Sequence, residues 1–504
     1  MNGEVKTQRR LLDYETSRRR FLAGVAATGV GTALATMWRL PELGGSTAHA
    51  AMQPASQAPV SSMGMGSATR QQSADLSAQI AHLLRRTGFS ATPQQIARYS
   101  ALGIEGAVDA IMTWDSSKDP GLDYANSVGL DLSKFADAQR WWLLRMMYTD
   151  RPFQEKMTLF WHGVLTSAVY KVGTRYLNTM IAQNEFLRSN ALGKMETLLK
   201  GISRDPAMMV WLDLQTSTKA HPNENFAREL MELFSLGIGN YTETDVRESA
   251  RAFTGYSLDK DRNFYFNAKN HDDGQKTFLG QTGNFSGDDI IDIIEQQRAA
   301  AEFICTKLWK FFASPNPDPQ TIGALADTYQ SSGHSIRAVM RQMLTMPQFY
   351  SDDAMNSLIK SPVEFVVGTV QMLGLRTNAA NYPAYLQQMG QELFNPPNVA
   401  GWPGGVAWLS SSSFFGRMNF LNYVIYGKES GLDPVNLLGS YVGANPTTVL
   451  NQAATLLGKP LGDTSTRAIM QFLGDSSNGS PTVTDKNVRS MLYLVLASPE
   501  NMLA

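Results

Sequence analysis

Cysteine is almost absent from this chain, because Cys305 is the only one among its 504 residues. An internal disulfide needs two cysteines, so none can form, and the Cys-x-x-Cys pattern of thiol-redox and c-type haem proteins is excluded as well. The neighbours Phe303 and Ile304 are apolar. This setting predicts that the thiol fills the core and does not act as a nucleophile.

Several familiar catalytic motifs are also missing from the sequence. It contains no His-Glu-x-x-His, no Gly-x-Ser-x-Gly and no Gly-x-x-x-x-Gly-Lys-Ser/Thr. These patterns mark zincin proteases, serine hydrolases with a nucleophile elbow, and P-loop enzymes. None of these three classes is expected for this chain.

The chain has no excess of either charge, with 44 Lys and Arg, 45 Asp and Glu, and a formal net charge of −1. Nucleic-acid-binding proteins draw much of their affinity from a basic surface. No nucleic-acid partner is therefore expected.

Residues 1–50 have the parts of a twin-arginine export signal. Arg18 and Arg19 precede a mildly apolar stretch at residues 21–37, and Ala-His-Ala at 48–50 matches a small-residue cleavage pattern. The apolar stretch contains several glycines and is shorter than the roughly 20 residues of a membrane span. We expect the twin-arginine translocase to export the folded protein to the periplasm or out of the cell, with no stable membrane span after cleavage.

Behind this signal we expect a flexible linker at residues 51–74 and a helical domain at residues 75–504. The linker is low in complexity, and Arg70 is its only charge. Beyond it, apolar residues recur at spacings of three and four, which is typical of amphipathic helices. The predicted fold class is all-α: a large multi-helical single domain with one small β-hairpin and long irregular loops. The hairpin would join residues 262–267 to residues 276–280.

The first candidate site is a charged stretch at residues 221–257. Glu224, Arg228 and Glu232 recur at intervals of four on one helix face, and Glu229 lies beside them. A ladder of ion pairs on a solvated face is one interpretation. The other is a cleft between two antiparallel helices, in which burial and arginine split the carboxylate pKa values into an acid and a base.

The second candidate is the polar segment that begins with His271 and Asp272. Adjacent His and Asp can ligate a metal or act as an acid–base pair, and Gly274 permits the sharp turn that would present them. A polar loop tip without any function has the same composition. Both interpretations stay open.

Two aromatic segments complete the candidates. Trp161 and His162 end a predicted helix, where the histidine is either a packing residue or a ligand contact. Residues 395–408 are interrupted by prolines and glycines and include Trp402. Such a loop either walls a pocket, with indole faces suited to sugars, or caps the helical body.

Seven stretches carry a family resemblance between about residues 80 and 420. They are His-Leu-Leu-Arg-Arg-Thr-Gly-Phe at 82–89, Phe-Trp-His at 160–162, Asn-Glu-Asn-Phe-Ala-Arg-Glu-Leu-Met-Glu-Leu at 223–233, Ala-Arg-Ala-Phe-Thr-Gly at 250–255, His-Asp at 271–272, Lys-Thr-Phe-Leu-Gly at 276–280, and Asn-Pro-Pro-Asn-Val-Ala-Gly-Trp-Pro-Gly at 395–404. The chain thereby resembles the uncharacterised bacterial family catalogued as domain of unknown function 1800. The resemblance implies a mainly helical fold and brings no activity. Val164 stands where many relatives have a second histidine, and Tyr256 where they have tryptophan.

The leading hypothesis is an exported hydrolase or lyase acting on an extracellular polymer, with a glycan favoured. Its catalytic residues would be Glu224, Arg228, Glu229, Glu232, His271 and Asp272. Its substrate-binding residues would be Trp161, His162, Arg251, Lys276, Asn398 and Trp402. The hypothesis requires carboxylates about 5 to 9.5 Å apart across a cleft.

Two other hypotheses are kept. One is a noncatalytic exported ligand-binding or assembly protein that uses the aromatic loop as its platform. The other is a divalent-metal enzyme that uses His162, His271 and Asp272, although no cofactor is predicted. All three depend on which candidate residues share a cavity.

Overall fold

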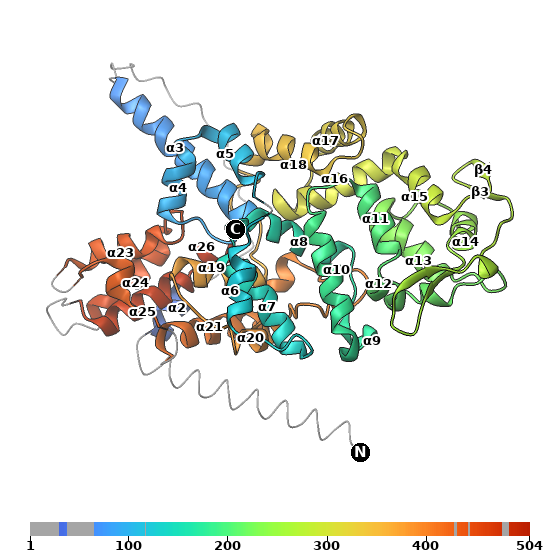
Figure 1. Cartoon of the computed structure of the whole chain (residues 1–504). Helices are drawn as coiled ribbons and strands as arrows, with labels where there is room; N and C mark the ends of the chain where they lie inside the picture. Colours follow the sequence, from blue (N-terminus) through green and yellow to red (C-terminus); the bar gives the residue numbers. More distant parts are fainter. Residues whose placement is uncertain (1–29, 38–64, 116, 428–430, 442–443, 476–482) are drawn as a thin grey trace, which may run out of the picture.

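Helices dominate the computed structural model of this protein (Figure 1), which describes residues 30–37, 65–115, 117–427, 431–441, 444–475 and 483–504. Within these ranges, the only paired strands form two small two-stranded sheets. The prediction of an all-α, multi-helical fold is confirmed.

Short and medium-length helices follow one another along the described chain. The helices up to residue 252 are α2 (Val30–Met37), α3 (Met65–Thr87), α4 (Pro93–Ser100), α5 (Gly103–Ile111), α6 (Pro120–Ser127), α7 (Phe135–Tyr148), α8 (Pro152–Val164), α9 (Val169–Val172), η1 (Thr174–Tyr176), α10 (Leu177–Ser189), α11 (Met195–Ser203), α12 (Pro206–Trp211), η2 (Leu214–Thr216), α13 (Glu224–Glu229), the π-helix η3 (Leu230–Ser235) and α14 (Glu243–Ala252). The later helices are η4 (Ala268–Asn270), α15 (Gly287–Glu295), α16 (Arg298–Phe312), α17 (Pro319–Ser331), α18 (Ile336–Thr345), η5 (Pro347–Tyr350), α19 (Pro362–Met372), α20 (Tyr382–Met389), η6 (Gly405–Leu409), α21 (Ser411–Tyr426), α22 (Pro434–Leu438), α23 (Pro446–Thr455), α24 (Asp463–Asp475), α25 (Asp485–Leu496) and α26 (Pro499–Met502). The strands are β1 (Tyr256–Leu258), β2 (Phe264–Phe266), β3 (Lys276–Phe278) and β4 (Gln281–Gly283).

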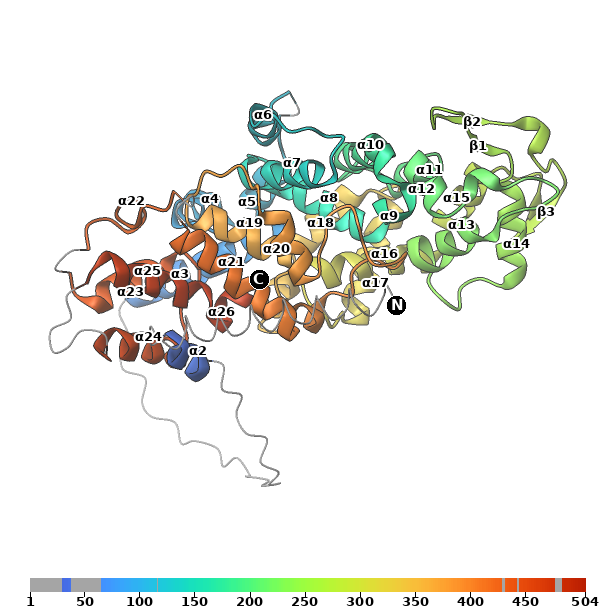
Figure 2. The ribbon, with the colours of Figure 1, turned by 90° about the horizontal axis from the view of Figure 1, so that it is seen from below.

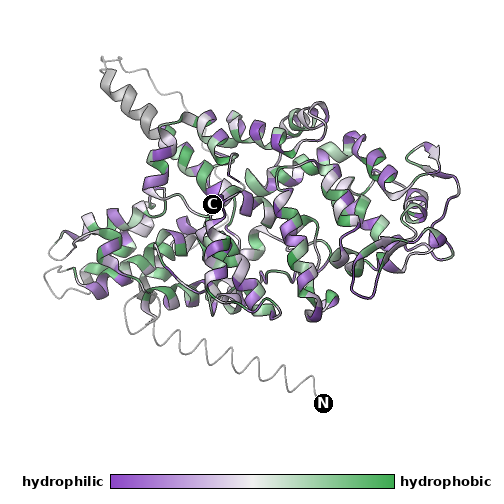
Figure 3. Cartoon of the chain, viewed as in Figure 1, coloured by the Kyte–Doolittle hydropathy of each residue, from purple (hydrophilic) through white to green (hydrophobic). Residues whose placement is uncertain are grey.

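The helices form an elongated body in both ribbon views (Figures 1 and 2). Helices α13 and α14 and strand β3 lie at one end, helices α23 to α25 lie at the other, and α8 and α16 lie between them. Most helices carry both hydrophobic and hydrophilic residues (Figure 3), as expected for amphipathic helices that bury one face.

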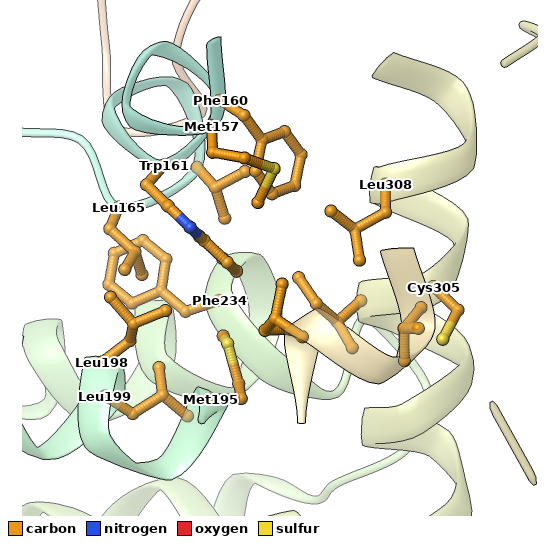
Figure 4. Close-up of a cluster of buried hydrophobic side chains, with 14 of the residues drawn as sticks. Met157, Phe160, Trp161, Leu165, Met195, Leu198, Leu199, Phe234, Cys305 and Leu308 are labelled. Atoms are coloured by element: carbon orange, nitrogen blue, oxygen red, sulfur yellow. The ribbon is translucent and has the colours of Figure 1, made fainter. Parts of the chain in front are cut away.

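One apolar core joins helices that are far apart in the sequence (Figure 4). This cluster contains Trp161 of α8, Leu198 of α11, Phe234 of η3 and Leu308 of α16. Cys305 is fully buried in the same core, and burial raises the pKa of its thiol to about 12. The predicted packing role of the cysteine is confirmed.

The expected single β-hairpin is wrong, because residues 262–267 and 276–280 do not pair with each other. Strand β1 pairs with β2, and β3 pairs with β4, both in antiparallel register. Local turns decide this pairing: Asp259 Oδ1 accepts hydrogen bonds from the backbone of Asp261 and Asn263, while Leu279 and Gly280 adopt φ angles of 45° and 79°. Each turn brings its own flanking strands together.

The N-terminal expectations fall partly outside the described residues, including Arg18, Arg19 and the proposed cleavage site at 48–50. Helix α3 begins at Met65, so the last ten residues of the expected linker are helical. Helix α2, from the expected apolar stretch, packs against α24 and α25 and buries Leu34. None of the described helices combines the length and apolar character that a membrane crossing requires.

Helix α19 packs so closely on the chain after α3 that Gly368 has no room for a side chain. An added Cβ would collide with the Phe89 carbonyl oxygen. We expect Gly368→Ala to lower the free energy of unfolding by about 1–3 kcal/mol, the usual cost of overpacking. Gly323→Ala in α17, where the nearest atom lies at 3.7 Å, is the matched control and should be neutral or slightly stabilising. Urea unfolding of both variants measures this, and equal stability would contradict the close approach.

Candidate functional site

A cavity of about 360 Å³ opens between α8, α16, the start of α19 and the loop before η6. Trp402, Trp408 and Phe311 supply aromatic surface, and Lys307, Lys310 and Glu364 supply charged groups. Small-molecule sites are concave, largely apolar and furnished with a few polar groups. This cavity has that composition.

The tryptophan loop, residues 395–408, is fixed against the end of α8. Gly401 adopts a φ of 83°, and an added Cβ would collide with the carbonyl oxygen of Gly163. Thr166 Oγ1 also donates a hydrogen bond of 2.8 Å to the carbonyl of Val399. These contacts hold the indole of Trp402 in the cavity wall.

The second tryptophan is fixed through its backbone carbonyl. Trp408 lies in the short helix η6 and is 6% exposed. Its carbonyl oxygen accepts hydrogen bonds from Ser413 Oγ at 2.8 Å and from Arg417 Nη2 at 3.3 Å. The two tryptophans therefore belong to a preorganised wall.

Glu364 lies at the first turn of α19 and forms an ion pair with the buried Lys156 of α8. Ser361 caps the helix, and its backbone N–H donates to Glu364 Oε2 at 2.6 Å. Burial alone would raise the pKa of Glu364, but Lys156 and Ser361 outweigh this effect and lower the pKa. The Glu364 carboxylate is therefore ionised, and the positive charge of Lys156 balances its negative charge.

Lys307 and Lys310 lie in the last turns of α16 and, unlike Glu364, have no ion-pair partner within the described ranges. Among the described residues, no carboxylate oxygen lies within 4.0 Å of either ammonium group. Lys307 is only partly exposed, and its Nζ lies 4.8 Å from the centre of the Phe303 ring. Burial, followed by the charge of Lys310, lowers the pKa of Lys307.

His162 lies behind the cavity wall. It is 1% exposed, burial lowers its pKa to about 3, and its Nε2 has no hydrogen-bond partner in the described part of the chain. Its ring centre is 5.5 Å from that of Trp402 and 5.2 Å from that of Trp142. Neutral His162 thus packs against Trp402, while its neighbour Trp161 is buried and donates to the carbonyl of Ala191.

The charged helices form an ion-pair ladder around Arg228. Its guanidinium reaches Glu243 at 2.7 Å and Glu224 at 3.3 Å. Glu232 does not join the ladder and accepts a hydrogen bond of 3.1 Å from Tyr241. The expected four-residue spacing fails at Glu232, because η3 is a π-helix with a wider turn.

Glu229 differs from its neighbours in this segment. Burial, followed by the charge of Glu232, raises its pKa, and Arg228 only partly opposes this effect. The raised pKa of Glu229 is the direction that a general acid needs, whereas the pKa of Asp272 is lowered.

The segment around His271 is held together by its own contacts. Arg251 binds both carboxylate oxygens of Asp272, at 2.7 and 3.1 Å, and lowers its pKa. His271 Nδ1 donates to the carbonyl of Thr254 at 2.8 Å, which fixes its tautomer. Lys276 is 1% exposed and donates to the carbonyls of Asp272 and Gly274.

Trp402 is the one predicted site residue that lines the cavity, and His162 contacts it from behind. Asn398 is exposed and accepts a hydrogen bond from the backbone of Ala400, which shapes the loop. The remaining predicted residues lie on the core side of α8 or around α13, α14 and β3. In the part of the chain that the structure describes, no three His, Cys, Asp or Glu side chains are grouped to hold a metal ion.

Sequence reasoning missed the charged part of the cavity. Lys307 and Lys310 interrupt the otherwise apolar end of α16, and this was the available signal. Glu364 gave the weaker signal of a capping box with Ser361. No pattern in the sequence links either segment to the tryptophan loop.

The fold and the cavity define an all-α protein with an aromatic-walled cavity. The chain belongs to the family described as "Protein of unknown function (DUF1800)", whose model matches residues 82–503. That match covers both α8 and the tryptophan loop and confirms the family resemblance. Searches of curated proteins and of solved structures each found no match.

Lys156 has a testable electrostatic role. Lys156→Met should lower the free energy of unfolding by about 3–5 kcal/mol at pH 7, because it leaves the Glu364 carboxylate unpaired. The lowered pKa of Glu364 means that the pair stabilises the fold above the ordinary carboxyl pKa and that this stability is lost as the pH falls through the lowered value. In the variant, burial without Lys156 raises the pKa of Glu364, so protonation removes the unpaired charge as the pH falls, and the deficit should shrink between pH 7 and pH 4.

Two variants control this measurement by chemical denaturation. Lys156→Met combined with Glu364→Gln should recover much of the loss, since no buried charge then remains unpaired. Lys134→Met removes an exposed pair with Asp131 and should cost less than about 1 kcal/mol. A pH-independent deficit in Lys156→Met would show that lost packing, and not charge, explains it.

Proposed function

We propose that this protein is an exported ligand-binding protein whose cavity takes a sugar-like ring or a short glycan segment. The observation that carries the proposal is the preorganised wall of Trp402 and Trp408 in a cavity of about 360 Å³. Flat indole faces pack well against the C–H faces of sugar rings. Cavities of roughly 300 Å³ and above take small ligands.

The charged helices support binding over catalysis. Arg228 engages Glu224, and Arg251 engages Asp272, so these carboxylates are tied up in ion pairs. A general acid needs a raised pKa, whereas the pKa of Asp272 is lowered. The noncatalytic hypothesis therefore accounts for more of the geometry than the hydrolase hypothesis does.

A binding measurement tests this proposal. Trp402→Ala should weaken the binding of a matching oligosaccharide by about ten-fold or more, the scale of a lost aromatic anchor. A glycan array would select the oligosaccharide, and isothermal titration calorimetry would measure the affinity. Trp114→Ala is the matched control, because Trp114 is also partly exposed but lies outside this cavity. Equal loss in both variants, or none in either, would contradict the proposal.

Export is the second part of the proposal and is supported by Arg18 and Arg19 ahead of the apolar stretch. Replacing both arginines by lysine should leave the precursor in the cytoplasm, as cell fractionation and immunoblotting would show. The same exchange at Arg9 and Arg10, a neighbouring arginine pair, is the control and should leave export intact. Export of both variants to the same extent would contradict the assignment.

A second candidate function, polymer hydrolysis, is favoured by Glu229. Its raised pKa suits a general acid, and the adjacent π-helix is a feature often found at functional sites. Glu229→Gln should then abolish the release of reducing ends from a polymer that the wild type cleaves. Unchanged release in this variant would remove the candidate.

A further inference from the structure

We propose that the ligand of the aromatic cavity is an anionic sugar, with a carboxylate or sulfate group held by Lys307 and Lys310. This inference rests on the proposed function and adds the chemical class of the ligand. It depends on the two lysines, on the carboxylate that shares the cavity with them, and on the aromatic wall.

The two lysines act on the same side of α16. They are three residues apart, so their side chains share one face of the helix, and both line the cavity. Phe311, from the same helix, adds apolar surface beside them. A single anionic group in the cavity is therefore within the shared reach of two ammonium groups.

Helix α16 has one other cationic residue, Arg298, which lies in its first turn. The Arg298 guanidinium forms ion pairs with Glu302 at 2.8 Å and with Asp327 at 2.5 Å. Lys307 and Lys310 have no such partner in the described chain. Among the described residues, carboxylates thus neutralise the cation in the first turn of α16 but not the two cations near its C-terminal end.

The helix dipole explains only part of this charge. Cations in the last turn of a helix are favoured by its C-terminal dipole, and this would suffice for the exposed Lys310. It does not explain why Lys307, which is partly buried, faces a cavity instead of solvent. The Lys307 ammonium group has the Phe303 ring at 4.8 Å but no carboxylate among the described residues, so an anionic ligand would offset desolvation energy that the ring contact alone does not.

Glu364 does not cancel these charges. Its carboxylate is bound to Lys156, so the Glu364–Lys156 pair contributes no net charge to the cavity. The lysines set the sign of the potential there. Electrostatic complementarity in a small site favours a ligand of the opposite sign.

Aromatic wall and cations together specify the ligand. The partly exposed Trp402 suits the face of a sugar ring, the largely buried Trp408 completes the wall, and the lysines suit an acidic substituent on the edge of the ring. Uronic acids and sulfated sugars have both features. Their shared chemistry is a ring with one negative group, so a binding experiment must compare the two.

The test uses trimers of galacturonic acid, galactose 6-sulfate and galactose as probes, with the full exported chain and titration calorimetry. At low salt, the wild type should bind one or both acidic trimers about ten-fold more tightly than the neutral trimer, as expected for charge-assisted contacts. The preference should fall as sodium chloride screens the lysines. The acidic trimer that binds more tightly identifies the carboxylate or the sulfate as the natural group.

Variants assign this preference to the two lysines. Lys310→Gln and Lys307→Met should each reduce the preference for acidic trimers, whereas Lys307→Arg should retain it. Lys134→Gln, a control at a lysine that does not line the cavity, should leave the preference unchanged. Lys310 is exposed, so Lys310→Gln keeps the test valid if Lys307→Met fails to fold.

Failure of this inference differs from failure of the proposed function. One outcome is that the wild type binds neutral and acidic trimers with equal affinity, with Trp402→Ala weakening the binding and the lysine variants leaving it unchanged. This result would overturn the anionic assignment and leave the proposal of sugar binding intact. Binding that Trp402→Ala does not weaken, or no binding of these trimers or of any oligosaccharide on the glycan array, would overturn both. An acidic preference that survives in Lys307→Met and Lys310→Gln would also overturn the assignment.

Discussion

The buried ion pair between Lys156 and Glu364 is the interaction on which the rest of the cavity depends. Lys156 is 1% exposed and also donates to the carbonyl of Gly88 at 2.8 Å. It thereby joins α8, the chain after α3, and the first turn of α19. A buried pair of this kind adds little net stability, but each partner is costly to lose because the other charge is left without compensation. The pair thus fixes the geometry beneath the cavity more than it stabilises the protein.

The same ion pair also determines the sign of the electrostatic potential in the cavity. Without Lys156, the carboxylate of Glu364 would oppose Lys307 and Lys310 across the cavity. With Lys156, the cavity has an apolar aromatic wall and a positive edge. Gly401 completes the arrangement, because only a residue without a side chain lets the tryptophan loop approach α8 closely. Helix α8 therefore positions both the tryptophan loop and the Lys156–Glu364 ion pair.

Apolar periodicity predicted the helical fold, and the apolar neighbours Phe303 and Ile304 predicted the burial of Cys305, because both signals are local properties of the sequence. It could not predict which strands pair, since the turns at Asp259 and Gly280 close each hairpin locally. The sequence indicated Trp402 as a pocket residue but not the lysines of α16, because their meeting depends on tertiary packing. Glu232 left its expected face because η3 has a wider turn, which helical spacing does not anticipate.

The central claim is that a ligand occupies the space between the tryptophan loop and α16. A crystal structure of the protein soaked with the tightest-binding acidic trimer tests this claim most directly. We expect a sugar ring against the indole of Trp402 and an acidic group within hydrogen-bond distance of Lys307 Nζ or Lys310 Nζ. A trimer bound instead at the carboxylates of α13 and α14, with the cavity empty, would contradict the claim and favour a site at Glu229.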